Sequence, residues 1–235
     1  MILMNDFKAE PLELKEAMQS ASKKVIDSGW YVLGNEVTSF EKKWANICGV
    51  DHGVGVGNGM DAIEIALRSL DIGPGDEVIT TTMTAFATVL AILRSGASPV
   101  LADIESSTAL ISFDSVERCL SSKTKAIVIV HLYGQVRSMS AWTSFCRDEN
   151  LHMIEDCAQA HLATLHGRVA GSFGDAGAYS FYPTKNIGAP GDAGRRPPAQ
   201  GRLPHPAPVG GARARALGGR APPTGAGCGT LQRGP

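Results

Sequence analysis

The sequence lacks any apolar run long enough to cross a membrane. The longest candidate, residues 85–93, has nine residues and includes Thr88, whereas a membrane-spanning helix needs about 20 apolar residues. The N-terminus also lacks the apolar core of a secretory signal, because the polar pair Asn5-Asp6 directly follows the first four residues. We therefore expect neither a membrane span nor export.

The sequence also lacks an excess of either charge and any C-x-x-C motif. The 22 Lys and Arg residues nearly balance the 23 Asp and Glu residues, for a net charge of −1. This balance argues against a nucleic-acid binder that relies on a large positive charge. No C-x-x-C pair occurs among the five cysteines, which lie at positions 48, 119, 146, 157 and 228. This dispersed, odd-numbered set is typical of a reducing compartment. We therefore expect a cytoplasmic location, no metal site and no nucleic-acid partner.

The last 41 residues lack most residue types. Residues 195–235 contain no Asp, Glu, Lys, Ser, Asn, Ile, Met, Phe, Tyr or Trp, and Gly, Pro, Arg and Ala make up 31 of them. Such a segment cannot bury enough apolar area to offset its ordering entropy, so we expect disorder after about residue 194. One interpretation is a basic arm that binds an acidic partner. The other, which we favour, is a slip of the coding frame near residue 195, because the change is abrupt and GC-rich codons read out of frame yield these residues.

Residues 1–194 alternate between helix and strand patterns. The helix at 59–70 has apolar residues at helical spacing and begins after Asn58, a good N-cap, and Asp114 is expected to cap the helix at 114–120. We expect further helices at 12–28, 85–94 and 140–149, and strands at 53–57, 77–80, 98–102, 126–130, 151–154 and 177–181. This alternation predicts a mostly parallel, doubly wound α/β sheet that binds ligands at the carboxyl ends of its strands.

A glycine turn enters the helix at 59–70. The run Gly57-Asn58-Gly59-Met60-Asp61-Ala62 joins a strand to a helix N-terminus, where backbone N–H groups can bind a phosphate. It also fits G-x-G-x-x-A, which raises the alternative of a dinucleotide site. That alternative needs an acidic residue at the end of the next strand, but here Thr80-Thr81-Thr82 stands there. A structural turn without a ligand is a third interpretation.

Two later segments carry chemistry suited to pyridoxal phosphate. Glu155-Asp156 follows an apolar strand pattern, and a carboxylate there could pair with the pyridine nitrogen of the cofactor. Gln159 could form a hydrogen bond with the ring's phenolic oxygen. Alternatively, one of the two acids could cap a helix. Lys185 could bond to the cofactor aldehyde, and Ser180 could donate to its phosphate. A loop lysine alone is usually a surface group, but the conjunction of these features in one order favours a cofactor site.

Six segments also match motifs of one family. They are residues 56–63 (a phosphate turn), 87–103 (a second βα unit), 131–135 (a strand-end loop), 155–161 (E-D-x-A-Q-A-H), 180–188 (a lysine loop) and 191–194 (a glycine-rich turn). From about Phe40 to Gly194 the chain resembles the DegT/StrS sugar aminotransferases, which are pyridoxal 5'-phosphate enzymes of fold type I. The resemblance implies an aspartate-aminotransferase-like large domain at 1–194, with the small C-terminal domain missing and residues 195–235 as a tail.

The resemblance also implies roles for single residues. Lys185 would bind the cofactor covalently and shuttle protons, while Asp156 would pair with the pyridine nitrogen and Gln159 with the phenolic oxygen. Ser180, with the backbone of Gly59, would bind the phosphate.

Two positions depart from the family pattern. Met60 stands where a small or hydroxylated residue is usual, so it would contribute only its backbone N–H to the phosphate. Ala85 stands where family members often place an aromatic ring over the cofactor.

The expected reaction follows from the family as well. It is transfer of an amino group from an amino acid such as glutamate to a nucleotide-linked keto-deoxysugar, with a 3-keto-6-deoxyhexose suggested by the resemblance of residues 131–135. The intact enzyme would be a homodimer. Because the match stops at Gly194, we expect this chain to be weakly active or inactive; the alternatives are a non-catalytic remnant and a dinucleotide-binding oxidoreductase.

Overall fold

The computed structural model describes residues 5–196. The chain divides into two units, Met1–Leu203 and Pro204–Pro235, and the fold below is that of the described part of the first unit. The predicted disordered tail lies outside the described residues except for Arg195 and Arg196, which belong to a strand.

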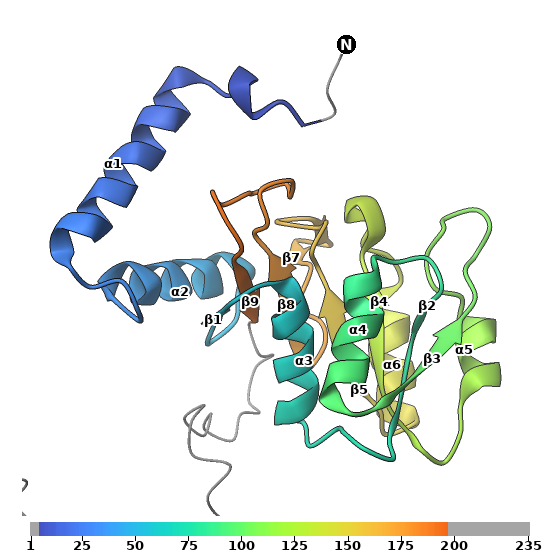
Figure 1. Cartoon of the computed structure of the whole chain (residues 1–235). Helices are drawn as coiled ribbons and strands as arrows, with labels where there is room; N and C mark the ends of the chain where they lie inside the picture. The colour runs from blue at the N-terminus through green and yellow to red at the C-terminus, as the bar shows by residue number, and fades with distance from the viewer. Residues whose placement is uncertain (1–4, 197–235) are drawn as a thin grey trace, which may run out of the picture. The chain divides into compact units, whose positions relative to one another are not determined.

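The helices and strands alternate along the chain as the sequence pattern predicts (Figure 1). The helices are α1 (Leu12–Ser28), α2 (Asn35–Cys48), α3 (Gly59–Ser69), α4 (Phe86–Ser95), α5 (Phe113–Cys119) and α6 (Met139–Asp148), with short 3₁₀ turns η1 (Phe7–Ala9) and η2 (Leu132–Gly134). The strands are β1 (Val54–Val56), β2 (Glu77–Thr81), β3 (Ser98–Ala102), β4 (Thr124–Val130), β5 (His152–Asp156), β6 (Thr164–Leu165), β7 (Arg168–Val169), β8 (Ala176–Ser180) and β9 (Gly194–Arg196). Sequence reasoning missed α2, the β6–β7 hairpin and β9.

Seven strands form one sheet in the order β1-β9-β8-β5-β4-β2-β3. The five strands from β8 to β3 are parallel to one another. Because β9 is antiparallel to both β1 and β8, β1 and β8 run in the same direction as each other. The predicted mostly parallel α/β sheet is confirmed, and the carboxyl ends of β1, β8 and β5 lie at one edge.

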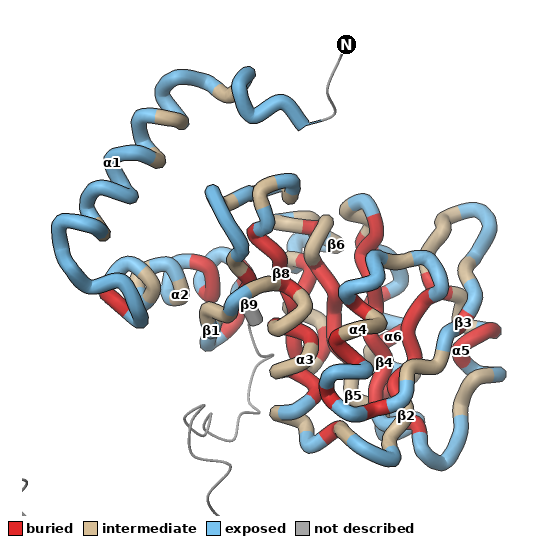
Figure 2. The backbone as a smooth tube through the Cα atoms, in the orientation of Figure 1, coloured by how far each residue is buried: buried red, intermediate tan, exposed pale blue. Residues whose placement is uncertain are grey.

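Both faces of the sheet are buried, which is why the central strands are rich in apolar residues (Figure 2). Successive residues of β4 point to opposite faces: Ile127 belongs to a cluster with Trp44 and Trp142, and Val128 to a second cluster with Ile63 and Ile92. Helices α2, α5 and α6 contribute to the first cluster, and α3 and α4 to the second. This two-sided cover is the doubly wound arrangement that the alternation predicts.

One predicted helix cap is wrong. Helix α5 begins at Phe113, and the residue that caps it is Ser112, whose hydroxyl accepts a hydrogen bond from the N–H of Ser115. Asp114 lies inside the first turn, where a negative charge still favours the helix dipole. By contrast, the predicted cap of α3 is confirmed, since the Asn58 side chain accepts from the N–H of Asp61 at 2.9 Å.

No helix among residues 5–196 is long and apolar enough to cross a membrane.

Candidate functional site

Three of the predicted site residues lie at or just beyond strand ends, on one edge of the sheet. Asp156 is the last residue of β5 and Ser180 the last of β8, and these two strands are parallel neighbours, with Asp156 paired in register to Ala178. Gly59 begins α3, three residues after the end of β1. Ligands of open α/β sheets bind at such an edge.

Gly59 and Ser180 are in direct contact. A Cβ atom at Gly59 would lie 2.7 Å from the Cβ of Ser180, closer than any side chain allows, so only glycine fits here. The first N–H groups of a helix have no intrahelical acceptor, so the N–H groups of Gly59 and Met60, at the start of α3, are available to a ligand near the point where Gly59 contacts Ser180. These donors fit a phosphate group.

The Met60 side chain points to a different partner. Its sulfur lies 3.9 Å from the guanidinium of Arg94, which also pairs with Asp61 and Glu64. With its side chain directed at Arg94, Met60 has its backbone N–H, at the start of α3, to offer a ligand.

The Asp156 carboxylate is buried and held at both oxygens. Its Oδ2 accepts a hydrogen bond from the Thr88 hydroxyl at 2.8 Å, and its Oδ1 accepts from the N–H of Ala158 at 3.1 Å. Asp156 is 6% exposed, and within residues 5–196 no cationic side chain forms an ion pair with it. A buried carboxylate without a cation fits a ligand that supplies positive charge, such as a protonated pyridine nitrogen.

Glu155, the neighbouring acid, has a structural role. Because alternate strand residues point to opposite faces, its side chain turns away from Asp156 and accepts hydrogen bonds from the N–H groups of Gly171, Phe173 and Gly174 at 2.7–2.8 Å. It also pairs with His131 at 2.8 Å, and both side chains are at most 2% exposed. Neither acid caps a helix, because β5 continues through Asp156 and the residues that follow form a turn.

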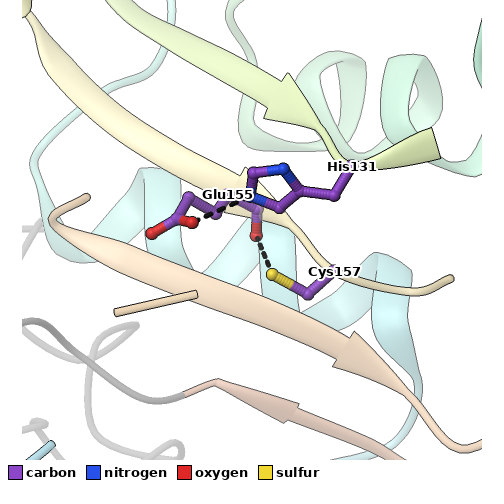
Figure 3. Close-up of side chains that lie close together, drawn as sticks. All are labelled: His131, Glu155 and Cys157. Atoms are coloured by element: carbon purple, nitrogen blue, oxygen red, sulfur yellow. Dashed lines mark hydrogen bonds and ion pairs between the residues drawn. The ribbon is translucent and has the colours of Figure 1, made fainter. Parts of the chain in front are cut away.

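His131, Glu155 and Cys157 lie close together and offer three atoms of the metal-ligand type within 4.8 Å (Figure 3). Each Glu155 oxygen already accepts two hydrogen bonds. Burial, together with the charge of Glu155, raises the pKa of the Cys157 thiol well above its usual value, so the thiol stays protonated and is a poor ligand. The cluster therefore ties the 171–174 turn to β4 and β5.

Gln159 lies beside the loop that follows β4. Its side-chain oxygen accepts a hydrogen bond from the N–H of Tyr133 at 3.0 Å, where the backbone is left-handed (φ 54°). This bond leaves the amide NH₂ of Gln159 to donate to a ligand oxygen.

Lys185 lies in the loop between β8 and β9, which is tied at both ends. The N–H of Ala189 donates to the carbonyl of Phe181, and the N–H of Phe181 donates to the carbonyl of Ala193. Lys185 is half-buried, and within residues 5–196 its amine forms no hydrogen bond or ion pair. The amine is therefore available to a ligand.

His161 links the Lys185 loop to the turn after β5. Its ring contacts Trp44 and Phe181 edge-on. Burial is the main cause that lowers the pKa of His161, and the Lys185 charge adds to it, while the side chain of Asn186 and the backbone of Ser180 oppose the shift. The histidine of the E-D-x-A-Q-A-H segment is thus kept neutral next to the lysine loop.

Sequence reasoning missed the role of Thr88. It lies 68 residues before Asp156, on a helix that packs on the sheet, so no local pattern connects the two residues.

Comparisons with known proteins identify the family of the chain. Residues 12–195 match the family model described as the DegT/DnrJ/EryC1/StrS aminotransferase family, so the match begins earlier than Phe40. One relative, dTDP-3-amino-3,6-dideoxy-alpha-D-galactopyranose transaminase of Aneurinibacillus thermoaerophilus, is 45% identical over 77% of this chain and 50% of its own. Another, UDP-N-acetyl-3-dehydro-alpha-D-glucosamine 3-aminotransferase of Acidithiobacillus ferrooxidans, is 42% identical over 82% of this chain and 52% of its own.

Solved structures share the fold. DesV of S. venezuelae superposes with a TM-score of 0.79 at 42% identity, covering 82% of this chain and 52% of DesV. Other solved relatives include forms with pyridoxal or pyridoxamine phosphate. The chain spans about half the length of the curated relatives it matches.

Proposed function

The chain belongs to the DegT/DnrJ/EryC1/StrS aminotransferase family, and from that premise we propose that it binds pyridoxal 5'-phosphate through Lys185 for transfer of an amino group to a sugar. The observation that carries the proposal is the buried Asp156 carboxylate, which lies at the carboxyl end of β5 and has no cationic partner among residues 5–196. The neighbouring strand β8 ends at Ser180, which contacts Gly59. We assign cofactor binding to residues 1–194 and no part of it to residues 195–235.

The residues present fit the cofactor. The N–H groups of Gly59 and Met60 and the hydroxyl of Ser180 would hold the phosphate, Asp156 would pair with the pyridine nitrogen, and Gln159 would donate to the phenolic oxygen. When bound, the cofactor supplies an electron sink for the carbon that gains or loses the amino group. Lys185 would hold the cofactor through its amine and, once displaced by an amino substrate, carry the proton to and from the reacting carbon.

We propose that the sugar is a nucleotide-linked keto-deoxysugar, with a 3-keto-6-deoxyhexose as the specific candidate and an amino acid such as glutamate as the donor. The name of the first relative above describes a sugar with its amino group at C3, and the name of the second describes amination at C3 of a 3-dehydro sugar, which supports that position. The assembly we propose for the intact enzyme is a homodimer. Because the chain spans half the length of these relatives, we expect its own turnover to be weak or absent.

The dinucleotide alternative finds no support in the sheet. β1 lies at an edge next to β9, whereas a dinucleotide-binding sheet places its first strand beside the second in the centre. The strand that follows the glycine turn, β2, ends in the buried threonines Thr80 and Thr81 instead of an acid. The remaining alternative, a non-catalytic remnant, is separated from the proposal by measuring cofactor binding.

The test is a spectroscopic titration of the 235-residue chain with pyridoxal 5'-phosphate. We expect wild type to develop the yellow absorbance of a lysine-bound cofactor, and Lys185→Ala to hold the cofactor only weakly and without that absorbance. Lys125→Ala, which removes an exposed lysine of β4, is the matched control and should titrate like wild type. A wild-type chain that develops no such absorbance would contradict the proposal and favour the remnant.

A further inference from the structure

We propose that Thr88 is the positioning residue that aims the Asp156 carboxylate at the cofactor's ring nitrogen, with Thr84 orienting Thr88 in turn. This inference rests on the proposed function, and it goes further by giving a role to two residues that the family motifs leave without one.

The hydroxyl of Thr88 is placed by secondary structure. Thr88 lies in the first turn of α4, it is 1% exposed, and its N–H donates to the carbonyl of Ala85. Its Oγ1 is 2.8 Å from Oδ2 of Asp156 and 2.8 Å from Oγ1 of Thr84. The helix therefore holds the hydroxyl at a fixed point beside the end of β5.

The direction of these two hydrogen bonds follows from the chemistry of the groups. An ionised carboxylate only accepts, and a hydroxyl has a single proton. Thr88 must therefore donate to Asp156 and accept from Thr84. The chain of donors runs in one direction, from Thr84 through Thr88 to the carboxylate.

Asp156 has little freedom left once these bonds form. Its backbone is fixed by parallel pairing with Val130 of β4 and Ala178 of β8, so only its side-chain torsions could vary. The Thr88 hydroxyl donates a hydrogen bond to Oδ2, and the N–H of Ala158, two residues after Asp156, donates one to Oδ1. The carboxylate plane is thereby set before a ligand arrives, and each oxygen keeps a lone pair for it.

The inference predicts that Thr88 acts only through the ring nitrogen. The probes are pyridoxal 5'-phosphate and its 1-deaza analogue, in which a C–H group replaces that nitrogen and cannot pair with a carboxylate. Dissociation constants of both are measured for the full chain as wild type, Thr88→Val and Thr88→Ser. Thr80→Val is the matched control, because Thr80 is equally buried but donates to the carbonyl of Val128 at 3.1 Å.

We expect Thr88→Val to weaken binding of pyridoxal 5'-phosphate about tenfold, the effect of losing one hydrogen bond to a charged group. Binding of the 1-deaza analogue should stay almost unchanged, and Thr88→Ser should restore the wild-type preference. Thr80→Val should change both constants equally. Thr84→Val should give a smaller loss that disappears in the Thr88→Val background.

The outcomes separate this inference from the proposed function. If wild type prefers the natural cofactor and Thr88→Val keeps the same preference, the proposed function stands and the role of Thr88 is refuted. An equal loss of both cofactors in Thr88→Val would also refute it, because that pattern indicates a packing defect. If wild type binds neither cofactor, the proposed function fails, and this inference with it.

Discussion

Glu155 and Asp156 are adjacent acids with opposite tasks. Both are buried, but the strand directs Glu155 to the backbone of residues 171–174 and Asp156 to Thr88 on α4. All the acceptor sites of Glu155 are used within the protein, whereas Asp156 keeps capacity for a ligand. The sequence shows that both acids occur after an apolar run. Only the structure shows to which face of the sheet each side chain points, and therefore which acid can bind a ligand.

The structural role of Glu155 predicts a large loss of stability on substitution. Glu155→Gln replaces one acceptor oxygen by an NH₂ group that would face backbone N–H donors, so at least one charge-assisted hydrogen bond is lost. We expect the free energy of unfolding to fall by about 1.5–3 kcal/mol or more. Denaturant titration measures it, with Glu64→Gln as control, since Glu64 pairs with Arg68 and Arg94 near the surface and should cost about 0–1 kcal/mol. Equal losses in the two variants would contradict the role of Glu155.

His161 predicts a loss of stability in acid. Its pKa is lowered from the ordinary 6.5, mainly by burial, so the unfolded chain binds a proton more readily than the folded one. Titration of His161 therefore leaves the free energy of unfolding unchanged above about pH 7 and lowers it as the pH drops below 6.5. His161→Phe should reduce the decline in melting temperature between pH 7 and 5, while His52→Gln, which changes an exposed histidine, should leave it unchanged. The same decline in His161→Phe as in wild type would exclude this contribution.

At the scale of the element, periodicity and caps predicted most helices and strands. Asn58 identified the start of α3, and the apolar run at 126–130 identified β4. Helix α2 was missed, although Phe40, Trp44 and Cys48 recur at a spacing of four residues, because charged residues between them mask the buried face. The sequence pattern predicts that this strand ends at Ile154, because charged residues are rare in buried strands, whereas β5 continues through Asp156. The hydrogen bonds of Glu155 and Asp156 compensate for their burial.

The corrected cap of α5 can be checked directly. Ser112 accepts a hydrogen bond from the helix N-terminus, whereas Asp114 contributes only through its charge. We expect Ser112→Ala to lower the free energy of unfolding by about 0.5–2 kcal/mol, and Asp114→Ala to lower it by less, about 0.3–1 kcal/mol. Thermal unfolding at low and high salt separates the two, because only the Asp114 effect should fade with salt. A larger loss in Asp114→Ala would restore the original prediction.

At the scale of the whole molecule, the site is assembled from distant parts of the chain. Gly59 touches Ser180, and Thr88 bonds to Asp156 across 68 residues. The sequence predicted that strand ends carry the site, because parallel strands share an edge. It could not predict these contacts, since they depend on the order of the strands and on how α4 packs on the sheet.

The hydrophobic core also predicts which residues the fold can lose. Among residues 5–196, the members of both buried clusters lie between positions 44 and 181. We expect a chain ending at residue 196 to unfold in the same cooperative transition as the 235-residue chain, within about 0.5 kcal/mol. Calorimetry of the two chains provides the measurement, and a marked drop in melting temperature on removing residues 197–235 would show that the tail supports the fold.

Chemical trapping identifies the lysine that binds the cofactor, which we propose is Lys185. The 235-residue chain is incubated with pyridoxal 5'-phosphate, reduced with borohydride, digested and mapped by mass spectrometry, with Lys185→Ala treated in parallel. We expect one phosphopyridoxyl group per chain, on Lys185, and no comparable labelling of the variant. Label on another lysine, or labelling of the variant equal to that of wild type, would show that Lys185 does not hold the cofactor.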